Sequence, residues 1–504
     1  MGPHRDLKGR TEIDARGQAI APGFVNMLAH PEESLFADGR ALSDLSQGVT
    51  LEVMGEGFSM GPLTDQMKEE LAAASLFGLE AEWTTLGEYL EHLERSGVSP
   101  NVASFVGSAT VREHELGADD RPPSAEELER MQGLVRDAMR EGAVGLAAAL
   151  VYAPAFYAAT DELMALTRAA GEHGGLYITH LRSEGNALLE ALDEFFTIIR
   201  SAGVRGEIYH LKASGRSNWH KLEELIGRVE DAQRDGVAVT ADMYTYTAGA
   251  TGLDGAMPPW VQAGGFEAWR ARLREPGIRA RVEQEMTTET DEWENMFLLA
   301  GPENIRLLAF KNEGLRALTG KTLAEVADQR QVSPAQAAMD LVIDDGTRVA
   351  AAYFTMSEEN VRRELALPWV SFCSDSPAPA AEGVFLEWST HPRAYGTFAR
   401  LLGKYVRDEG IVPLEEAIRR LTSLPAANLR IADRGTLEPG RFADVVVFDS
   451  EAIQDHATYD EPHRYATGVT HVAVNGELVL RDGEHTGALP GRVVRGPGYV
   501  SARR

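Results

Sequence analysis

The sequence has little cysteine, a shortage of positive charge and no long apolar run. Its single cysteine, Cys373, cannot form an intrachain disulfide, which fits a reducing compartment, and we therefore expect a cytoplasmic protein. Lys and Arg number 49 against 77 Asp and Glu, and the formal net charge of −28 at pH 7 argues against nucleic acid and anionic membranes as partners. No apolar run approaches the roughly 20 residues that a membrane span needs. The first ten residues lack the apolar core of a signal peptide.

The 504 residues are enough for a large barrel together with a smaller domain. Hydrophobic residues make up 44% of the chain and charged residues 25%, as is typical of a soluble globular protein. The sequence does not indicate an oligomeric state.

Two short apolar runs, 175–180 and 206–210, each end in a histidine. Both are bounded by glycine, as buried parallel strands often are, and segment 186–202 between them carries apolar residues at helical spacing. The unit is therefore strand, helix, strand, with His180 and His210 at the strand ends where α/β barrels carry their chemistry. An alternative interpretation is that each histidine is an ordinary polar residue at the end of a strand. Two histidines at the same place in consecutive units favour a role in metal binding or acid–base catalysis, because imidazole is a common metal ligand.

The same strand pattern recurs along the chain. Further strands are expected at 21–30, 48–59, 102–107, 143–151, 237–246, 307–310 and 369–375, with helices between them, among them 124–141. About eight strands alternating with helices predict an α/β fold of the (β/α)8 TIM-barrel type. The pattern breaks over about 247–304, which we interpret as an excursion from the barrel.

After helices near 394–408, 414–421 and 426, the pattern changes to short strands. Segments 435–448 and 468–480 carry turn signals, and Asn475-Gly476 is a strong hairpin signal. A strand near Glu12 is expected to join them. We therefore expect three parts: an N-terminal strand of a small β domain (1–22), the barrel (23–429), and the C-terminal part of the β domain (430–504).

Polar side chains collect at the expected strand ends. They are His30, Glu56, His180, His210 with Lys212, Asp242 with Tyr244, and Asp375. Imidazoles and carboxylates around one barrel mouth suit a zinc-type hydrolytic site, in which the metal lowers the pKa of bound water and a carboxylate takes the proton.

These residues resemble the amidohydrolase superfamily and, within it, the N-acyl-D-amino-acid deacylase (D-aminoacylase) family. The matching motifs are Ala21-Pro-Gly-Phe, Gly48-Val-Thr, Gly57-Phe-Ser, Thr179-His-Leu-Arg, His210-Leu-Lys, Asp242 with Tyr244, Ser374-Asp375, His391-Pro-Arg393 and Gly396-Thr-Phe. The resemblance covers about residues 20–492. It implies an amidohydrolase-type barrel, a β-sandwich built from both chain ends, and hydrolysis of the amide bond of an N-acyl amino acid.

The resemblance also implies roles for single residues. His180 and His210 would hold the zinc, with Glu56 where the family places a metal-binding cysteine, and His30 is a further candidate ligand. Asp375 would be the general base and is also a candidate ligand. Lys212 and Arg393 would grip the substrate carboxylate, and Tyr244 would donate a hydrogen bond to the substrate. Alternative interpretations are a solvated surface charge for Lys212 or Arg393, simple packing for Tyr244, and a helix N-cap for Asp375.

The chain departs from the family pattern at the first strand. The family has a His-x-His pair here, and Leu28 stands in place of its first histidine, so one ligand of a second metal is missing beside His30. We therefore expect one zinc per chain. Glu56 also suits other divalent metals. Ala250 stands near the position where the family carries a serine that helps to hold the substrate. The expected partner is a small molecule with a carboxylate. Alternatives are hydrolysis of another linear or cyclic C–N bond, a non-hydrolytic reaction on an amide-bearing metabolite, or an inactive binding protein.

Overall fold

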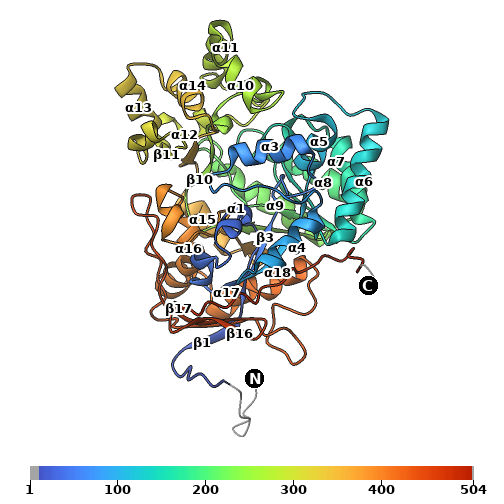
Figure 1. The fold of residues 1–504 in the computed structure, drawn as a ribbon, viewed down its shortest axis with the longest axis vertical. Coiled ribbons are helices and arrows are strands. Elements are labelled where there is room, and N and C mark those ends of the chain that lie inside the picture. Colours follow the sequence, from blue (N-terminus) through green and yellow to red (C-terminus); the bar gives the residue numbers. More distant parts are fainter. Residues whose placement is uncertain (1–10, 502–504) are drawn as a thin grey trace.

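The computed structural model describes residues 11–501 and has an α/β fold built on two parallel sheets (Figure 1). The first sheet has the order β2-β3-β4, with β2 at Phe24–Asn26, β3 at Val49–Met54 and β4 at Asn101–Ser104. The second has the order β13-β9-β8-β7-β6-β5. Its strands are β5 (Val106–Gly107), β6 (Gly145–Ala149), β7 (Leu176–His180), β8 (Gly206–Ile208), β9 (Val239–Met243) and β13 (Val370–Phe372). All neighbours in both sheets run parallel.

Backbone hydrogen bonds connect the two sheets at both ends. On one side, Met27 N donates to Phe372 O at 3.2 Å, just beyond the end of β2 and at the last residue of β13. On the other, Val144 N donates to Ser104 O at 3.0 Å, next to β6 and at the end of β4. The carboxyl ends of all these parallel strands therefore lie at one edge.

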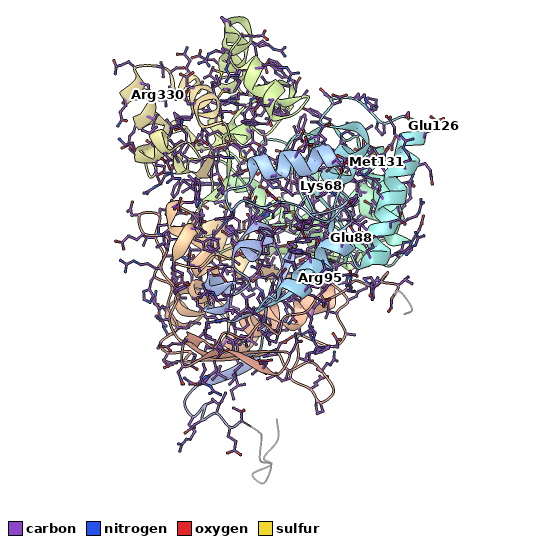
Figure 2. All side chains as sticks on the ribbon, in the orientation of Figure 1. Lys68, Glu88, Arg95, Glu126, Met131 and Arg330 are labelled. Atoms are coloured by element: carbon purple, nitrogen blue, oxygen red, sulfur yellow. The ribbon has the colours of Figure 1, made fainter. Side chains whose placement is uncertain are left out.

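Helices alternate with the parallel strands and cover them on the outside. The main ones are α4 (Leu86–Ser96), α5 (Ser108–Leu116), α6 (Ala125–Glu141), α7 (Thr160–Gly171), α8 (Leu188–Ala202), α9 (Leu222–Arg234), α15 (Glu358–Leu365), α16 (Arg393–Arg400), α17 (Leu414–Leu421) and α18 (Ser423–Asn428). A π-helical segment, Leu401–Asp408, continues α16. In α6, Ser124 caps the first turn with Glu127, and Met131 is fully buried while Glu126 lies at the periphery (Figure 2). The helices expected at 124–141, 186–202, 394–408 and 414–421 are confirmed.

A subdomain is inserted between β9 and α15, and we call residues 249–353 the inserted subdomain. It contains an antiparallel sheet of order β10-β12-β11, with β10 at Gly249–Gly252, β11 at Ile305–Ala309 and β12 at Ala350–Tyr353. Its helices are α10 (Phe266–Arg272), α11 (Pro276–Met286), α12 (Met296–Ala300), α13 (Leu323–Arg330) and α14 (Pro334–Asp345), drawn green to yellow at the top of Figure 1.

The inserted subdomain has a hydrophobic core of its own, which includes Trp269, Phe310 and Met339. The prediction of a barrel strand at 307–310 is therefore wrong. This apolar run pairs antiparallel with β12, and the insertion continues well past residue 304, where we expected it to end. Burial alone makes a strand apolar, so the run does not reveal which sheet it joins.

A fourth sheet, also antiparallel, lies at the end of the molecule opposite the inserted subdomain (Figure 1). Its order is β1-β14-β15-β16-β17, with β1 at Ala19–Pro22, β14 at Val445–Phe448, β15 at Val469–Val474, β16 at Glu477–Arg481 and β17 at Glu484–His485. Asn475 and Gly476 have φ values of 52° and 83° and form the expected hairpin turn.

The N-terminal strand of this sheet differs from the prediction. It lies at Ala19–Pro22, where it pairs with β14, rather than near Glu12, which is outside any strand. The first ten residues of the expected 1–22 segment lie outside the described part of the chain. Among residues 11–501, no helix combines the length and apolar composition that crossing a membrane demands.

Candidate metal centre

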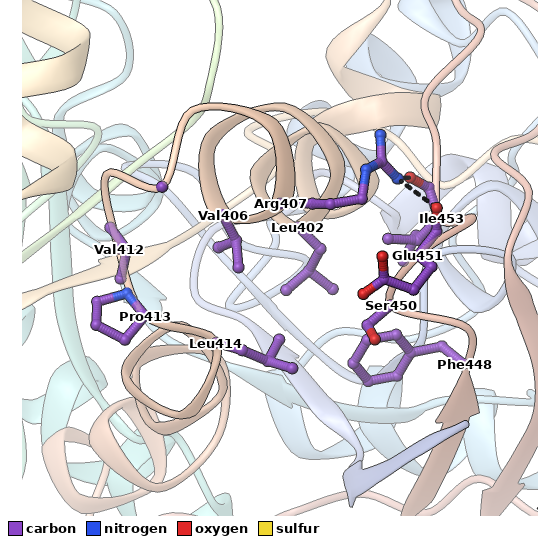
Figure 3. Close-up of a pocket in the computed structure, with 11 residues that line it drawn as sticks. Leu402, Val406, Arg407, Val412, Pro413, Leu414, Phe448, Ser450, Glu451 and Ile453 are labelled. Atoms are coloured by element: carbon purple, nitrogen blue, oxygen red, sulfur yellow. Dashed lines mark hydrogen bonds between the residues drawn. The ribbon is translucent and has the colours of Figure 1, made fainter. Parts of the chain in front are cut away.

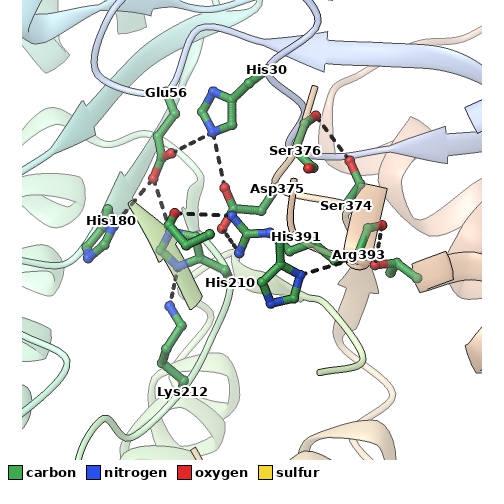
Figure 4. A network of polar contacts seen from close by, with 12 residues as sticks. His30, Glu56, His180, His210, Lys212, Ser374, Asp375, Ser376, His391 and Arg393 are labelled. Atoms are coloured by element: carbon green, nitrogen blue, oxygen red, sulfur yellow. Dashed lines mark hydrogen bonds and ion pairs between the residues drawn. The ribbon is translucent and has the colours of Figure 1, made fainter. Parts of the chain in front are cut away.

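Three of the predicted ligands meet at the carboxyl ends of β3, β7 and β8. His180 is the last residue of β7, and Glu56 and His210 each follow their strand by two residues. Oε1 of Glu56 lies 3.1 Å from Nε2 of His210 and 3.5 Å from Nδ1 of His180 (Figure 4). The side chains of all three are buried, with exposed fractions between 3% and 8%.

The spacing of these atoms suits a metal ion. Zinc ligand atoms in a tetrahedron lie about 2.0–2.2 Å from the metal and hence about 3.3 Å from one another, close to the two distances on Glu56. The rings of His180 and His210 meet edge to face, with centroids 4.5 Å apart. Two imidazoles and a carboxylate form a donor set that zinc accepts. The residues present therefore fit a bound metal.

A second group shares the Glu56 carboxylate. His30 Nε2 lies 3.3 Å from Oε2 of Glu56 and 3.1 Å from Oδ1 of Asp375. These three residues also converge closely enough to hold a metal. Leu28, which stands in place of a histidine, is fully buried in the apolar cluster at the centre of the fold. It supplies no donor to this group.

The cluster stabilises positive charge. Burial lowers the pKa of His30, but hydrogen bonds and charge from Asp375 and Glu56 outweigh it and raise that pKa to about 10. Burial and Lys212 lower the pKa of His210, yet Glu184 and Glu56 raise it to about 10. Burial raises the pKa of Glu56, but the imidazoles around it hold that pKa well below its ordinary value. A divalent cation would supply the same positive charge in place of protons on the rings.

Asp375 pairs with Arg393. Nη1 of Arg393 lies 2.7 Å from Oδ2 of Asp375, and both side chains are buried. Burial raises the pKa of Asp375, but the Arg393 charge and the His30 hydrogen bond hold it below its ordinary value. An ionised carboxylate is able to accept a proton. The helix N-cap alternative for Asp375 is wrong, because the next helical segment begins only at Gly383.

Lys212, Tyr244 and Arg393 lie together beside the cluster. The Arg393 guanidinium lies 4.6 Å and the Lys212 ammonium 5.8 Å from the centre of the Tyr244 ring. Lys212 is 6% and Arg393 3% exposed, so the alternative of solvated surface charges is wrong for both. Each cation already has an anionic partner, since Lys212 Nζ donates to Oε1 of Glu184 at 2.7 Å.

Other polar residues near the cluster support its geometry. The carboxylate of Asp242 accepts a hydrogen bond from the backbone N–H of His210 at 2.8 Å, and so holds the strained turn in which His210 has a φ of 34°. Nδ1 of His391 accepts a hydrogen bond from the backbone N–H of Arg393 at 3.0 Å, and its Nε2 meets the hydroxyl of Tyr459, also at 3.0 Å. His391 and Tyr459 thus brace Arg393.

Sequence reasoning did not single out Glu184 and Glu294, two carboxylates that converge with His180. Glu184 follows His180 by four residues and faces it in the structure, a spacing that was visible in the sequence. Glu294 comes from the inserted subdomain, and no local signal connects it to the site. Both are buried.

A surface pocket of about 380 Å³ lies away from this cluster, between the π-helical segment and the end of β14 (Figure 3). Its walls are mostly apolar, including Leu402, Val406 and Phe448, and Arg407 donates to Ile453 O at 2.6 Å. None of its lining residues is a histidine, and none belongs to the cluster of Glu56, His180 and His210.

The sequence matches a family model over most of its length. The description of that model is amidohydrolase family, and the match spans residues 11–480. The chain belongs to this family. The predicted membership of the amidohydrolases is confirmed. It agrees with the cluster of carboxylates and imidazoles at the strand ends of this amidohydrolase.

Individual deacylases resemble this amidohydrolase over nearly its full length. It is 32% identical to the D-aminoacylase of Alcaligenes xylosoxydans xylosoxydans, over 98% of the chain and 91% of the relative. A solved D-aminoacylase structure, described for its binuclear metal center, aligns with a TM-score of 0.79 at 32% identity, over 98% and 93% of the two chains. A second solved structure is that of N-acyl-D-glutamate deacylase from Bordetella bronchiseptica, complexed with zinc and a phosphonate mimic of the tetrahedral intermediate. It aligns with a TM-score of 0.79 at 30% identity, over 98% of this chain and 92% of the other.

Proposed function

We propose that this amidohydrolase is a metal-dependent deacylase that cleaves the amide bond of an N-acyl-D-amino acid to a carboxylate and a free amino acid. The observation that carries the proposal is one buried cluster in which Glu56, His180 and His210 face the ion pair of Asp375 and Arg393. The D configuration and the acyl amino acid class are inferred from the named activities of the relatives.

The proposed metal is one zinc ion per chain, held by Glu56, His180 and His210. When bound, zinc polarises the amide carbonyl and lowers the pKa of water toward neutrality. The choice of zinc is supported by the zinc in the related glutamate deacylase. A single ion is supported by Leu28, which supplies no ligand next to His30.

Asp375 is the proposed general base. As an ionised carboxylate it takes a proton from the attacking water while the new C–O bond forms. When the C–N bond breaks, Asp375 returns that proton to the leaving amine. The Arg393 ion pair holds Oδ2 of Asp375 in place, and the other oxygen faces His30.

The substrate carboxylate is proposed to bind beside Arg393, Lys212 and Tyr244. Within the described residues, the buried Nε of Arg393 makes no hydrogen bond, so a donor is available for an incoming carboxylate. The Tyr244 ring lies against the same guanidinium, and its hydroxyl is proposed to donate a hydrogen bond to the substrate. Lys212 would add a second positive charge.

A substrate panel tests the proposed function. We expect purified protein loaded with zinc to release acetate from N-acetyl-D-amino acids and to cleave the L enantiomers far more slowly. The panel also contains a hydantoin and a dihydropyrimidine. Cleavage of these cyclic amides without cleavage of any N-acyl amino acid would redirect the proposal to ring-opening chemistry.

We further propose that the parallel strands form one closed (β/α)8 barrel, spanning about residues 23–429 and interrupted by the inserted subdomain. The hydrogen bonds at both junctions of the two sheets support closure, with β4 and β5 taken as one strand. The antiparallel sheet that joins β1 to the segment after about residue 430 supports a small β-sandwich domain built from both chain ends.

A further inference from the structure

One carboxylate faces both histidines on the side away from Glu56. Oε2 of Glu184 lies 3.3 Å from Nε2 of His180, and Oε1 lies 3.1 Å from Nδ1 of His210. These are the ring nitrogens that do not point toward Glu56. In a metal-bound imidazole, the second nitrogen carries a proton, and the acceptor of that proton decides which nitrogen faces the metal.

Glu184 is positioned to be that acceptor for His180, and it also lies 3.1 Å from Nδ1 of His210, where Lys212 Nζ is 2.7 Å from the same nitrogen. The Glu184 side chain is 5% exposed, and Lys212 Nζ donates to both of its oxygens, at 2.7 and 2.8 Å. The buried Nε2 of His180 has no hydrogen bond of normal geometry among the described residues, which leaves Glu184 as the carboxylate within reach of it. A single anion thus neutralises Lys212 and faces both rings.

The inserted subdomain holds the backbone of Glu184. The carboxylate of Glu294, just before α12, accepts hydrogen bonds from the backbone N–H groups of Glu184 and, at 3.1 Å, of Gly185. Asn186 Nδ2 also donates to Thr290 O at 3.1 Å. Glu294 is 6% exposed, so these contacts are shielded from water. The loop after β7 is thereby fixed from the inserted subdomain.

We propose that Glu184 is a positioning residue that orients the rings of His180 and His210 for the metal, and that Glu294 holds Glu184 in place from the inserted subdomain. This inference rests on the proposed metal site. In this role Glu184 acts on the two rings and not on the substrate. It acts by fixing which nitrogen of each ring faces Glu56.

A zinc affinity measurement tests this role. The zinc Kd is measured by competition with a chromophoric chelator, and the cobalt(II)-substituted protein is examined by visible absorption, which reports ligand geometry. We expect Glu184→Gln to weaken zinc binding by about 10- to 100-fold and to change the cobalt spectrum, since an amide does not accept from both rings as a carboxylate does. A Glu184→Gln protein with the wild-type Kd and spectrum would overturn the proposal.

Two further variants separate positioning from other effects. Glu294→Ala should weaken zinc binding in the same direction, and Glu294→Gln should restore most of the affinity because its carbonyl oxygen still accepts a hydrogen bond. Exposed glutamates nearby, changed as Glu190→Gln and Glu292→Gln, are matched controls that should keep the wild-type Kd. An equal loss in Glu292→Gln would contradict a specific role for Glu294.

The Lys212 charge is tested separately. Glu184→Gln leaves Lys212 without its carboxylate, and an unpaired ammonium near the metal would repel it. If adding Lys212→Met to Glu184→Gln restored the wild-type zinc Kd, the effect would belong to the lysine charge and the positioning role would be wrong. Continued weak binding in the double variant supports it. Absence of metal from the wild-type protein would instead refute the proposed function itself.

Discussion

The Glu56 carboxylate lies 3.1 Å from Nε2 of His210, and through its other oxygen it reaches a second histidine, His30, at 3.3 Å. The D-aminoacylase pattern that this chain resembles has a cysteine at this position. A carboxylate is a harder ligand than a thiolate and has two donor atoms rather than one. We therefore expect the exchange to change which metals the site prefers without removing the site.

Substitution of Glu56 tests its part in metal binding. Glu56→Ala should lose tightly bound zinc, because two histidines alone leave the ion without an anionic ligand. Glu56→Cys should keep zinc and shift preference toward cadmium, because a thiolate favours softer metals. Competition titrations of zinc against cadmium and manganese measure this shift. Unchanged metal content in Glu56→Ala would exclude Glu56 as a ligand.

Removal of the proposed base should separate metal binding from turnover. Asp375→Asn keeps the size of the side chain but cannot accept a proton, so we expect kcat to fall by about 10²- to 10⁴-fold with zinc content unchanged. Steady-state kinetics and elemental analysis of the same preparation check both parts. Activity at the wild-type level would remove Asp375 from the base role.

Arg393→Ala should affect substrate binding and pH dependence together. We expect KM to rise for N-acyl amino acids but to change little for their carboxamide analogues, which lack the carboxylate. Because the Arg393 charge lowers the pKa of Asp375, its loss should raise that pKa. The base is active when ionised, so the acidic limb of kcat/KM should move to higher pH. A profile that stays in place would contradict the coupling.

Metal binding should stabilise the fold. A ligand present at 100 times its Kd, and bound by the folded state alone, adds about 2.7 kcal/mol to the free energy of unfolding. Zinc-loaded protein should therefore unfold at a higher temperature than chelator-treated protein. Calorimetry on both forms measures the difference, and the Glu56→Ala variant should show almost none at the same zinc concentration.

Sequence reasoning located the centre of the site because its residues stand at strand ends. His180 and Glu56 follow buried apolar runs, and parallel strands bring such ends to one edge. Asp375 was also placed at a strand end, while its role as base and the part of Arg393 came from the family resemblance. Partners that arrive from distant loops carry no such signal, which is why Glu294, more than 100 residues from His180 in the sequence, was missed.

Local elements of the fold were also predictable from the sequence, whereas the pairing of distant strands was not. The capping residues and apolar spacing of segment 124–141 predict its helix, and the turn preference of Asn475-Gly476 predicts the hairpin. The strand at Ile305–Ala309 was assigned to the wrong sheet because pairing depends on β12, some 45 residues later in the chain. The N-terminal strand was predicted near Glu12 instead of at Ala19–Pro22 for the same reason, because its position depends on pairing with β14.

The most direct test is the metal content of protein purified without added metal, measured by elemental mass spectrometry beside a His180→Ala, His210→Ala double variant. We expect about one zinc per wild-type chain and none in the variant. Two metals per chain would show that His30, Glu56 and Asp375 form a second site despite Leu28. No metal in the wild-type protein, even after zinc is supplied, would contradict the metal-dependent mechanism.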